Sequence, residues 1–185
     1  MQTTTAKAIQ TKWMLDPSHS ELVFKVKHLM IANVKGSFRS FSAIIDGEDF
    51  RTAPIHVTIE ASSVFTNDDN RDGHLRTPDF FDVETFRTIS FESSNFKKLD
   101  GEHYQLTGIL TIKGISREVK LQVEFGGTNT DPYGNEKAGF SVSGSINRSE
   151  WGLNWNAALE TGGVLVSDEV KIQAELQFVR KSDSI

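Results

Sequence analysis

The segment from Arg71 to Asp82, RDGHLRTPDFFD, holds the side chains best suited to chemistry. It places the imidazole of His74 near the guanidinium of Arg71 and the carboxylates of Asp72 and Asp79. Histidine changes charge near neutral pH, so this His74 cluster could move a proton on a substrate or hold a polar head group. The same charges could instead pair with one another and fix a loop, which is the commoner role of such groups. We favour the pairing role and keep His74 as a candidate head-group contact.

Three further histidines, His19, His28 and His103, raise the question of a metal site. A zinc site needs three or four converging ligands, commonly at short spacings. His19 and His28 lie about 30 Å apart on a fully extended chain, so they cannot share one ion directly. We therefore expect no metal. We expect His28 to face the interior in register with Val26, because both belong to one alternating run.

The segment NRSEWG contains Arg148, Glu150 and Trp151. In one interpretation, the indole of Trp151 forms a wall of a binding channel while Arg148 meets a polar head group. In the other, the tryptophan closes one end of a small barrel and the arginine packs across it. The sequence leaves both interpretations open.

Motifs for covalent catalysis are weak. Residues 139–144, GFSVSG, resemble a serine elbow only superficially, because they lie inside an alternating strand and not at a strand-to-helix turn. Asp68 and Asp69 lie in polar loop sequence, where solvation explains them. The chain has no cysteine, which excludes thiol nucleophiles and thiolate metal sites. We expect a protein that is not an enzyme; the alternative is a hydrolase or isomerase that uses the His74 cluster on a lipid-like substrate.

Alternating sequence predicts the elements that must position these groups. In EVKLQVEF (118–125) and EVKIQAELQF (169–178), apolar residues alternate with polar ones. The pattern recurs over residues 22–26 and, more weakly, over 140–146. One dry face and one wet face is typical of antiparallel sheet. Asp100-Gly101, between two such runs, is a strong hairpin signal.

These runs predict eight long strands and a short one that precedes them. The long strands are expected near residues 20–29, 34–46, 54–61, 88–98, 103–112, 117–126, 137–147 and 168–179, and the short one near 13–16. Strands joined in sequence order favour an up-and-down barrel, because closure removes both sheet edges. We expect an all-β fold: an extended eight-stranded antiparallel barrel with one or two short helices, in residues 67–82 and 149–167.

The composition fits a single domain of ordinary globular type. The chain has 185 residues, of which 37% are hydrophobic, 24% are charged and 13 are phenylalanine. Its 20 basic and 25 acidic side chains give a net charge of −5, which disfavours nucleic acid as a partner. We expect a flexible segment at 1–12, one barrel domain at 13–180 and a tail at 181–185. Neither a signal sequence nor a membrane-spanning run is apparent, so we expect a cytoplasmic protein.

Five segments, in order, resemble the YceI-like family of lipocalin-like, polyisoprenoid-binding barrel proteins. They are DPSHSELVFKVKHL at 16–29, RDGHLRTPDFFD at 71–82, TGILTIKGISREV at 107–119, INRSEWGLNW at 146–155 and VSDEVKIQAELQF at 166–178. The resemblance implies a lipocalin-like barrel with a long apolar channel, which holds an isoprenoid or another long-chain lipid without covalent chemistry. Many members carry an export signal and are periplasmic, and this sequence departs from them in that respect.

We therefore expect non-enzymatic binding, storage or transport of a long-chain apolar lipid, such as an isoprenoid quinone, a polyprenyl compound or a fatty acyl chain. The expected channel lining is Phe24, Val26, His28, Phe38, Phe91, Leu110, Phe140, Ile146 and Trp151, with His74, Leu75, Phe80 and Phe81 at an opening. No cofactor other than this lipid is expected. A homodimer and a transient membrane contact are compatible with the sequence. A filled barrel that serves as a protein-interaction module is the remaining alternative.

Overall fold

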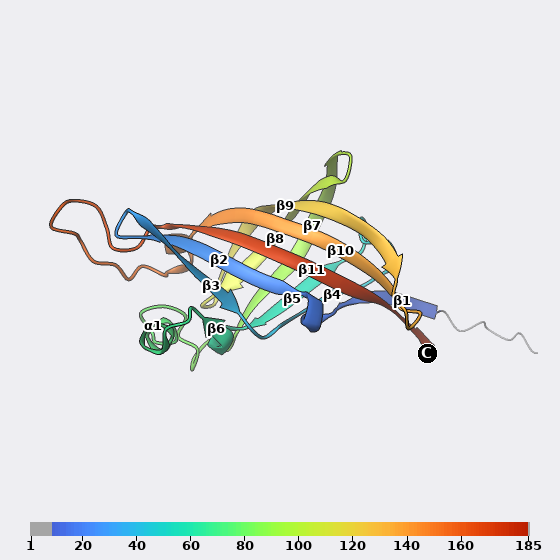
Figure 1. Cartoon of the computed structure of the whole chain (residues 1–185), viewed down its shortest axis with the longest axis horizontal. Helices are drawn as coiled ribbons and strands as arrows, with labels where there is room; N and C mark the ends of the chain where they lie inside the picture. The colour runs from blue at the N-terminus through green and yellow to red at the C-terminus, as the bar shows by residue number, and fades with distance from the viewer. Residues whose placement is uncertain (1–8, 185) are drawn as a thin grey trace, which may run out of the picture.

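The computed structural model describes residues 9–184, which form one antiparallel sheet that closes on itself. Figure 1 shows an elongated barrel with helix α1 (Asp69–Leu75) at one end and the C-terminus at the other. We call these ends the α1 end and the far end. The barrel closes where β1 (Ile9–Leu15) pairs with β11 (Glu169–Ser184).

Within residues 9–184, eleven strands fill eight positions in the barrel wall, because three of the positions are each divided between two short strands. The divided positions hold β1 with β2 (Glu21–His28), β3 (Ala32–Phe38) with β4 (Phe41–Ile45), and β5 (Ile55–Glu60) with β6 (Val64–Phe65). The continuous strands are β7 (Thr88–Asp100), β8 (His103–Ile112), β9 (Ile115–Thr130), β10 (Glu136–Asn147) and β11. The expected all-β, eight-stranded antiparallel barrel is confirmed.

The divided positions bend the barrel wall. The 3-10 turn η1 (Pro17–His19) separates β1 from β2, and Pro17 has no backbone N–H to donate to a ladder. The run 34–46, expected as one strand, is interrupted at Arg39, whose backbone N–H bonds the carbonyl of Ser63. The two halves of this run therefore have different partners, because β3 pairs with β2 and β6 whereas β4 pairs with β1 and β5.

The outermost strands reach further than the apolar alternation indicated. β1 begins at Ile9, inside the segment expected to be flexible, and β11 runs to Ser184, inside the expected tail. Main-chain pairing here continues through polar residues such as Thr11 and Ser182, which a search for apolar alternation does not detect. Residues 1–8 of the expected flexible segment, and residue 185, lie outside the described residues.

One of the two segments expected to carry a helix does so. α1 follows Asp68, whose side chain accepts a hydrogen bond from the backbone N–H of Arg71 and caps the helix. The second segment has only a 3-10 turn, η3 (Arg148–Trp151), which ends at Gly152 with φ 72°, and then an irregular loop. Within residues 9–184, no helix has the length and hydropathy to cross a bilayer.

Aromatic rings pack together at the far end of the barrel, near the loop between β4 and β5. Phe50, in the loop between β4 and β5, meets the rings of Phe125 and Phe140 at centroid distances of 4.7 and 5.1 Å. It also meets the rings of Phe96 and Tyr104, at 5.8 and 5.9 Å. A loop residue thus packs among side chains from four strands and plugs this end, and we call these five residues the aromatic plug.

Candidate functional site: an apolar channel

The barrel encloses a cavity of about 650 Å³ with an almost wholly apolar wall, and we call this cavity the channel. Its volume lies in the range of pockets that bury most of a small ligand. Of the thirteen residues expected at the binding site, twelve line the channel: Phe24, Val26, His28, Phe38, His74, Leu75, Phe80, Phe81, Phe91, Leu110, Phe140 and Ile146. The structure therefore brings together residues that are spread over most of the sequence.

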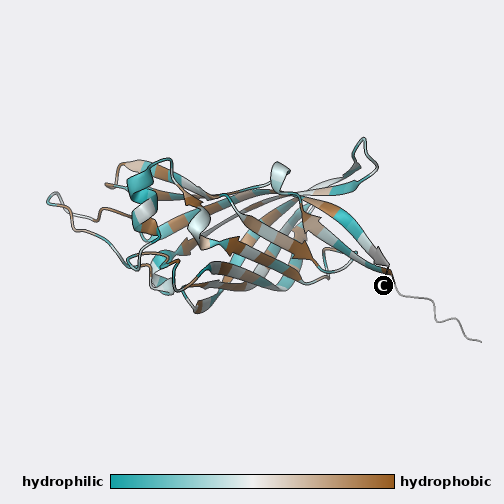
Figure 2. Cartoon of the chain, turned by 90° about the horizontal axis from the view of Figure 1, so that it is seen from below, coloured by the Kyte–Doolittle hydropathy of each residue, from teal (hydrophilic) through white to brown (hydrophobic). Residues whose placement is uncertain are grey.

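The period-two pattern of the strands produces the apolar wall. Along β11, every second side chain lines the channel, from Val170 through Ala174 to Phe178. The side chains between them, such as Lys171 and Gln173, are exposed on the outer surface. Figure 2 shows the same alternation as brown and teal bands along the strands. Neighbouring strands repeat it, so the inner surface of the barrel is continuous in its apolar character.

The polar groups of the channel gather at the α1 end. Helix α1 is held against β6 by Asp72, whose Oδ1 accepts hydrogen bonds from the backbone N–H and the hydroxyl of Thr66, at 2.8 and 2.5 Å. Arg71 donates to the hydroxyl and to the backbone carbonyl of Thr66, at 2.7 Å each. Thr66 and Arg71 line the channel together with Asn70. This end of the channel can therefore meet a polar group, whereas the rest of the wall cannot.

His74 pairs with a carboxylate and also lines the channel, the two roles considered for it from the sequence. Its Nε2 lies 2.8 Å from Oδ2 of Asp79, so the pair ties α1 to the loop that follows it. The imidazole also packs edge-on against the rings of Phe80 and Trp155, at centroid distances of 5.1 and 4.8 Å. One face of the cluster pins the loop, and His74 still lines the channel.

Trp151, the thirteenth expected residue, does not line the channel. Its side chain is buried, with 1% of its surface exposed, and its Nε1 donates to the backbone carbonyl of Leu110 at 2.9 Å. Trp151 lies on the turn η3 and not on a strand, and its ring belongs to the buried core beside β8. Its role in the structure is to fasten η3 to the barrel wall.

Arg148 fastens the loop over 153–167 to the same place. Only 5% of its surface is exposed, and its guanidinium donates to the carbonyls of four residues: Leu153 at 2.5 Å, Ser167 at 2.9 Å, Trp155 at 3.0 Å and Val166 at 3.3 Å. Burial lowers the pKa of this guanidinium, and the nearby charge of Asp168 opposes the shift. The arginine thus organises the loop through backbone carbonyls and reaches the edge of the channel.

The sequence interpretation missed several lining residues at the α1 end of the channel, which we call its mouth. Thr66, Asn70, Trp155, Leu165 and Val166 line it, and all come from segments without alternation. Trp155 lies in INRSEWGLNW, so the family resemblance of that segment was the available signal for it. For the other four residues no local pattern distinguishes the inner from the outer face.

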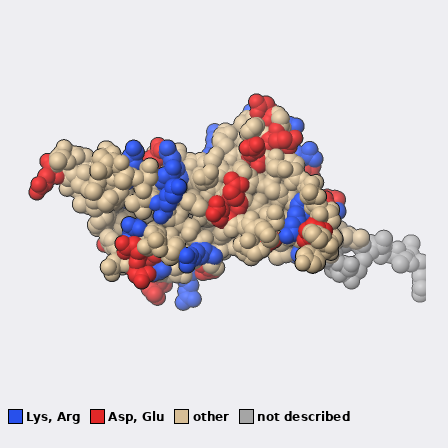
Figure 3. Space-filling view, viewed as in Figure 1, with Lys and Arg blue, Asp and Glu red and all other residues tan. Residues whose placement is uncertain are grey.

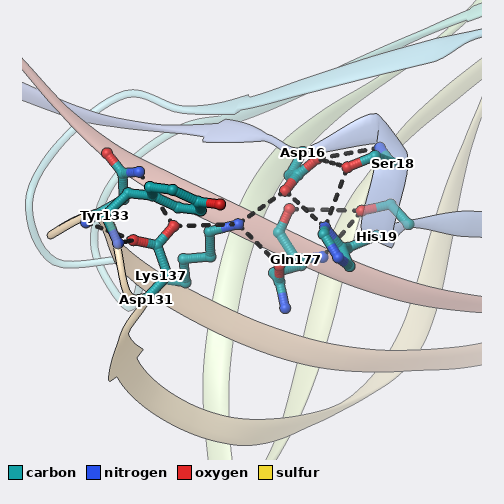
Figure 4. Close-up of polar contacts among 9 residues, drawn as sticks. Asp16, Ser18, His19, Asp131, Tyr133, Lys137 and Gln177 are labelled. Atoms are coloured by element: carbon teal, nitrogen blue, oxygen red, sulfur yellow. Dashed lines mark hydrogen bonds and ion pairs between the residues drawn. The ribbon is translucent and has the colours of Figure 1, made fainter.

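A second polar cluster lies around η1 (Figure 4). Oδ1 of Asp16 accepts hydrogen bonds from the backbone N–H and the hydroxyl of Ser18, at 3.0 and 2.6 Å. Its Oδ2 lies 2.9 Å from Nδ1 of His19 and 3.0 Å from Nζ of Lys137. Lys137 also donates to the side chain of Gln177 at 3.3 Å. These contacts hold the break between β1 and β2 against β10 and β11.

The serine, histidine and aspartate of this cluster do not form a catalytic relay. The hydroxyl of Ser18 lies 3.1 Å from Nδ1 of His19, and this is the nitrogen that Asp16 also contacts. In a relay the two partners use opposite ring nitrogens. The hydrogen bonds from Ser18, then those from His19 and Lys137, hold the pKa of Asp16 far below its ordinary value. The cluster is therefore a stable cap, and none of these four residues lines the channel.

Metal ligands do not converge at either cluster. Among the side chains that the structure describes, no group of three histidine, aspartate or glutamate residues could hold an ion. His19 lies on η1, whereas His28 lines the channel. The chemistry available at the site is therefore apolar contact along the channel and hydrogen bonding at its α1 end.

Comparison with known proteins gives concordant results. A family model described as YceI-like domain matches residues 13–178. A UPF0312 protein of Staphylococcus aureus is 42% identical over 171 residues, which cover 91% of this chain and 97% of the relative.

Two solved structures extend the comparison to the fold. BcnA of Burkholderia cenocepacia superposes with a TM-score of 0.76 at 26% identity, over 88% of this chain and 98% of that one. A polyisoprenoid binding domain from Saccharophagus degradans, implicated in plant cell wall breakdown, superposes with a TM-score of 0.69 at 17% identity, over 91% and 98%. At that identity the second likeness concerns the fold.

Proposed function

This chain belongs to the YceI-like family, and on that premise we propose that it binds a long-chain apolar lipid in its channel without altering it chemically. The observation that carries the proposal is the channel itself, about 650 Å³ of space with an almost wholly apolar wall. A cavity with an apolar wall favours a ligand whose own apolar surface is removed from water when it binds. The description of the Saccharophagus degradans domain as polyisoprenoid binding supports an isoprenoid as the ligand class.

The free energy of binding comes from the tail of the ligand. Burial contributes about 0.8 kcal/mol for each methylene transferred from water, before the cost of association is subtracted. Several isoprene units are therefore enough for tight binding. Branched or unbranched chains both satisfy an apolar wall, so a fatty acyl chain competes with an isoprenoid for the same space.

The head group lies at the α1 end in this proposal. Arg71, Asn70 and His74 supply hydrogen-bonding groups there, and the aromatic plug closes the opposite end to anything polar. A ligand that enters tail first therefore places its tail toward the plug and its head near α1. The protein then acts as a carrier or a store, which releases the same molecule that it took up.

Binding is favoured over catalysis by the state of the candidate catalytic group. Nε2 of His74 is engaged by Asp79, and the ring is packed against Phe80 and Trp155. A general acid or base must approach a reacting atom and also find a partner that orients it. Here the partner and the packing hold a loop in place, which is the structural role that the sequence favoured.

Narrowing the channel tests the proposal. Ala174 is buried and lines the channel, so Ala174→Leu places a larger side chain in the space that the lipid would occupy. The neighbouring Gln173 is exposed on the outer face of the same strand, which makes Gln173→Leu the matched control. We expect Ala174→Leu to weaken binding at least tenfold with little change in thermal stability, and Gln173→Leu to leave binding unchanged.

The measurement is native mass spectrometry of protein purified without detergent, followed by extraction of bound lipid and titration of the delipidated protein with isoprenoid and fatty acyl chains. A lipid at near one-to-one stoichiometry that is lost in Ala174→Leu supports the proposal. Protein that takes up no chain of either kind in titration contradicts it. Equal losses in both variants would place the ligand elsewhere.

A further inference from the structure

The hairpin between β2 and β3 exposes three large apolar side chains. Leu29, Met30 and Ile31 are 41%, 52% and 83% exposed, and we call them the apolar tip. They lie beside the loop over 153–167 at the α1 end, where both loops project from the barrel (Figure 1). Large apolar side chains that cluster at a protruding turn, and not singly over a surface, are typical of a binding surface.

The backbone conformation of this turn is one that large apolar residues rarely adopt. Leu29 and Met30 both have positive φ, at 53° and 64°. Glycine, asparagine and aspartate adopt this region at little cost, whereas a leucine or methionine is strained there. A sequence selected for turn stability alone would place Asn-Gly at these two positions. The apolar side chains are therefore kept at a cost to the folded state.

A row of lysines crosses the outer face of the sheet behind the tip. In the antiparallel ladders Lys25 lies directly opposite Lys35 on β3 and directly opposite Lys171 on β11. Lys27 follows Lys25 on the same face, toward the tip. Like charges that face each other across strands are destabilising. Among the side chains that the structure describes, none of these four lysines forms an ion pair.

Basic side chains predominate on the side of this face that is nearer the apolar tip. Figure 3 shows basic atoms as a band across this face near the α1 end, with acidic atoms toward the middle of the barrel and others at the α1 end itself. Glu21 and Glu175 face each other on the far side of the row, away from the tip. Asp168 and Glu169 precede Lys171, and Glu160 lies on the neighbouring loop, so the four lysines outnumber these three carboxylates.

The apolar tip adjoins the mouth of the channel. The backbone N–H of Leu29 bonds the carbonyl of Leu165 at 2.9 Å, and His28 forms a bridge with Val166. His28, Leu165 and Val166 all line the channel. Whatever surface the tip contacts therefore lies next to the channel opening.

We propose that the α1 end docks on the surface of an anionic lipid bilayer, with the apolar tip in the interface and the lysine row above the head groups. Apolar side chains backed by lysines match the two forces that hold proteins at such a surface, which are burial of apolar area and attraction to anionic lipid. Bilayer docking goes beyond the proposed lipid binding, because it concerns the outer surface and does not require an occupied channel.

The test is co-sedimentation of the full chain with vesicles of phosphatidylcholine, alone or with about 30% phosphatidylglycerol to give an anionic surface. We expect the protein to bind the anionic vesicles and to bind neutral ones at least tenfold more weakly. Binding should weaken as salt is raised, since screening shortens the reach of the lysines to about 3 Å at 1 M salt. Each lysine changed in Lys25→Gln, Lys35→Gln and Lys171→Gln should lower binding by up to about fivefold.

The turn itself provides the sharpest variant. Leu29→Asn with Met30→Gly supplies residues that suit positive φ, so the double variant should fold at least as stably as the parent while its vesicle binding falls at least tenfold. Ile31→Ser is a second variant that leaves the strained positions unchanged. Tyr133→Ser removes an aromatic side chain that is 90% exposed in the loop between β9 and β10, and it should leave vesicle binding unchanged.

Three results would overturn the proposal. They are absence of binding to anionic vesicles, equal binding by the parent and the Leu29→Asn, Met30→Gly variant, and a concentration-dependent dimer that Ile31→Ser abolishes. The last result, measured by light scattering, would show that a second copy of the chain covers the tip. Failure of lipid to enter the channel would leave vesicle binding intact, so the two proposals can fail separately.

Discussion

A single carboxylate, Asp16, joins η1 to β10 at the break between β1 and β2. It caps η1, contacts His19 on that turn and pairs with Lys137 on β10 (Figure 4). Hydrogen bonds from Ser18, His19 and Lys137 favour its charged form and hold its pKa far below the ordinary value. A lowered pKa in the folded state means that ionisation of this group stabilises the fold.

The pH dependence of that stabilisation is a testable prediction. In the unfolded chain the pKa of aspartate is about 3.9, so the contribution is fully present above that pH and is lost as pH falls toward the lower folded-state value. We expect Asp16→Asn to lower the free energy of unfolding by about 1 kcal/mol at pH 7, because the amide keeps the cap but loses the charge. Urea unfolding at several pH values is the measurement, and the difference between the two proteins should shrink below pH 4.

Asp100→Asn is the control for Asp16→Asn. The side chain of Asp100 is 89% exposed and lies 3.6 Å from that of His103, which is 59% exposed. Exposed pairs of this kind contribute little, so the substitution should change stability by less than about 0.5 kcal/mol. A difference for Asp16→Asn that persisted unchanged at pH 2 would mean that the lost stability does not come from the charge.

At the scale of elements, the loop over 153–167 owes its conformation to Arg148. Four backbone carbonyls accept from this one side chain, and the loop contributes only a few backbone bonds of its own, such as that from Leu165 to the carbonyl of Ala157. Removal of the guanidinium would leave the carbonyls of Leu153, Trp155 and Ser167 without this donor, whereas that of Val166 also accepts from Nδ2 of Asn156 at 2.7 Å. Loss of the arginine should therefore disorder both the loop and the channel mouth that the loop helps to form.

Arg148→Met tests this dependence. We expect it to lower the free energy of unfolding by about 3 kcal/mol, since buried groups left without partners cost about 1–3 kcal/mol each and the loop can relax toward water. Hydrogen exchange of the loop amides, including that of Leu165, should accelerate more than exchange in β8 and β9. Arg117→Met, at an exposed position near the start of β9, is the control and should change neither quantity. Equal, small effects in both variants would show that the loop holds its conformation without the arginine.

The strands were predictable from the sequence, whereas the loops that complete the mouth were not. Alternation alone placed Phe24, Phe140 and Ile146 on the inner face, and the structure has them lining the channel. Trp155 has no such pattern, and its place depends on carbonyl contacts with Arg148 that are distant from any local propensity. Trp151 was wrongly placed in the lining because alternation ends before it and it lies on the turn η3, not on a strand.

The division of the wall strands was equally invisible to pattern analysis. Residues 34–46 alternate enough to be one strand, but they are interrupted at Arg39 and Ser40, whose backbone groups bond Ser63 and Glu60. These contacts join two segments whose proximity depends on the closed sheet. A pattern can report which face of a strand is dry, but it cannot report with which neighbour the strand pairs.

For the molecule as a whole, the aromatic plug at the far end and the polar groups at the α1 end give the channel two different ends. The plug depends on Phe50, which enters from a loop and meets four other rings. Its position should set the greatest chain length that the channel accepts. A ligand longer than the space below the plug would have to leave its head outside the mouth.

Phe50→Ala should therefore change ligand length as well as stability. We expect a loss of about 2–3 kcal/mol in the free energy of unfolding, below the usual range for a fully buried phenylalanine because Phe50 is only half-buried. The preferred chain should lengthen by one or more isoprene units in titrations with a graded series. Phe65→Ala, which removes a ring beneath Arg39 that does not line the channel, should lower stability without any change in preferred length. An unchanged length preference in Phe50→Ala would contradict the role of the plug.

Closure of the barrel between β1 and β11 also has a consequence for how the protein is made. Leu15 pairs with Phe178, so nearly all of the described chain must be synthesised before these two strands can meet. Ribosomes add about 5–20 residues per second, which leaves the inner faces of the earlier strands open to water for many seconds. Contacts between residues so distant in sequence also form slowly. The nascent protein therefore passes through a stage in which it is an open sheet with an exposed apolar face. Its yield in a cell should depend on how well chaperones bind that face and prevent aggregation.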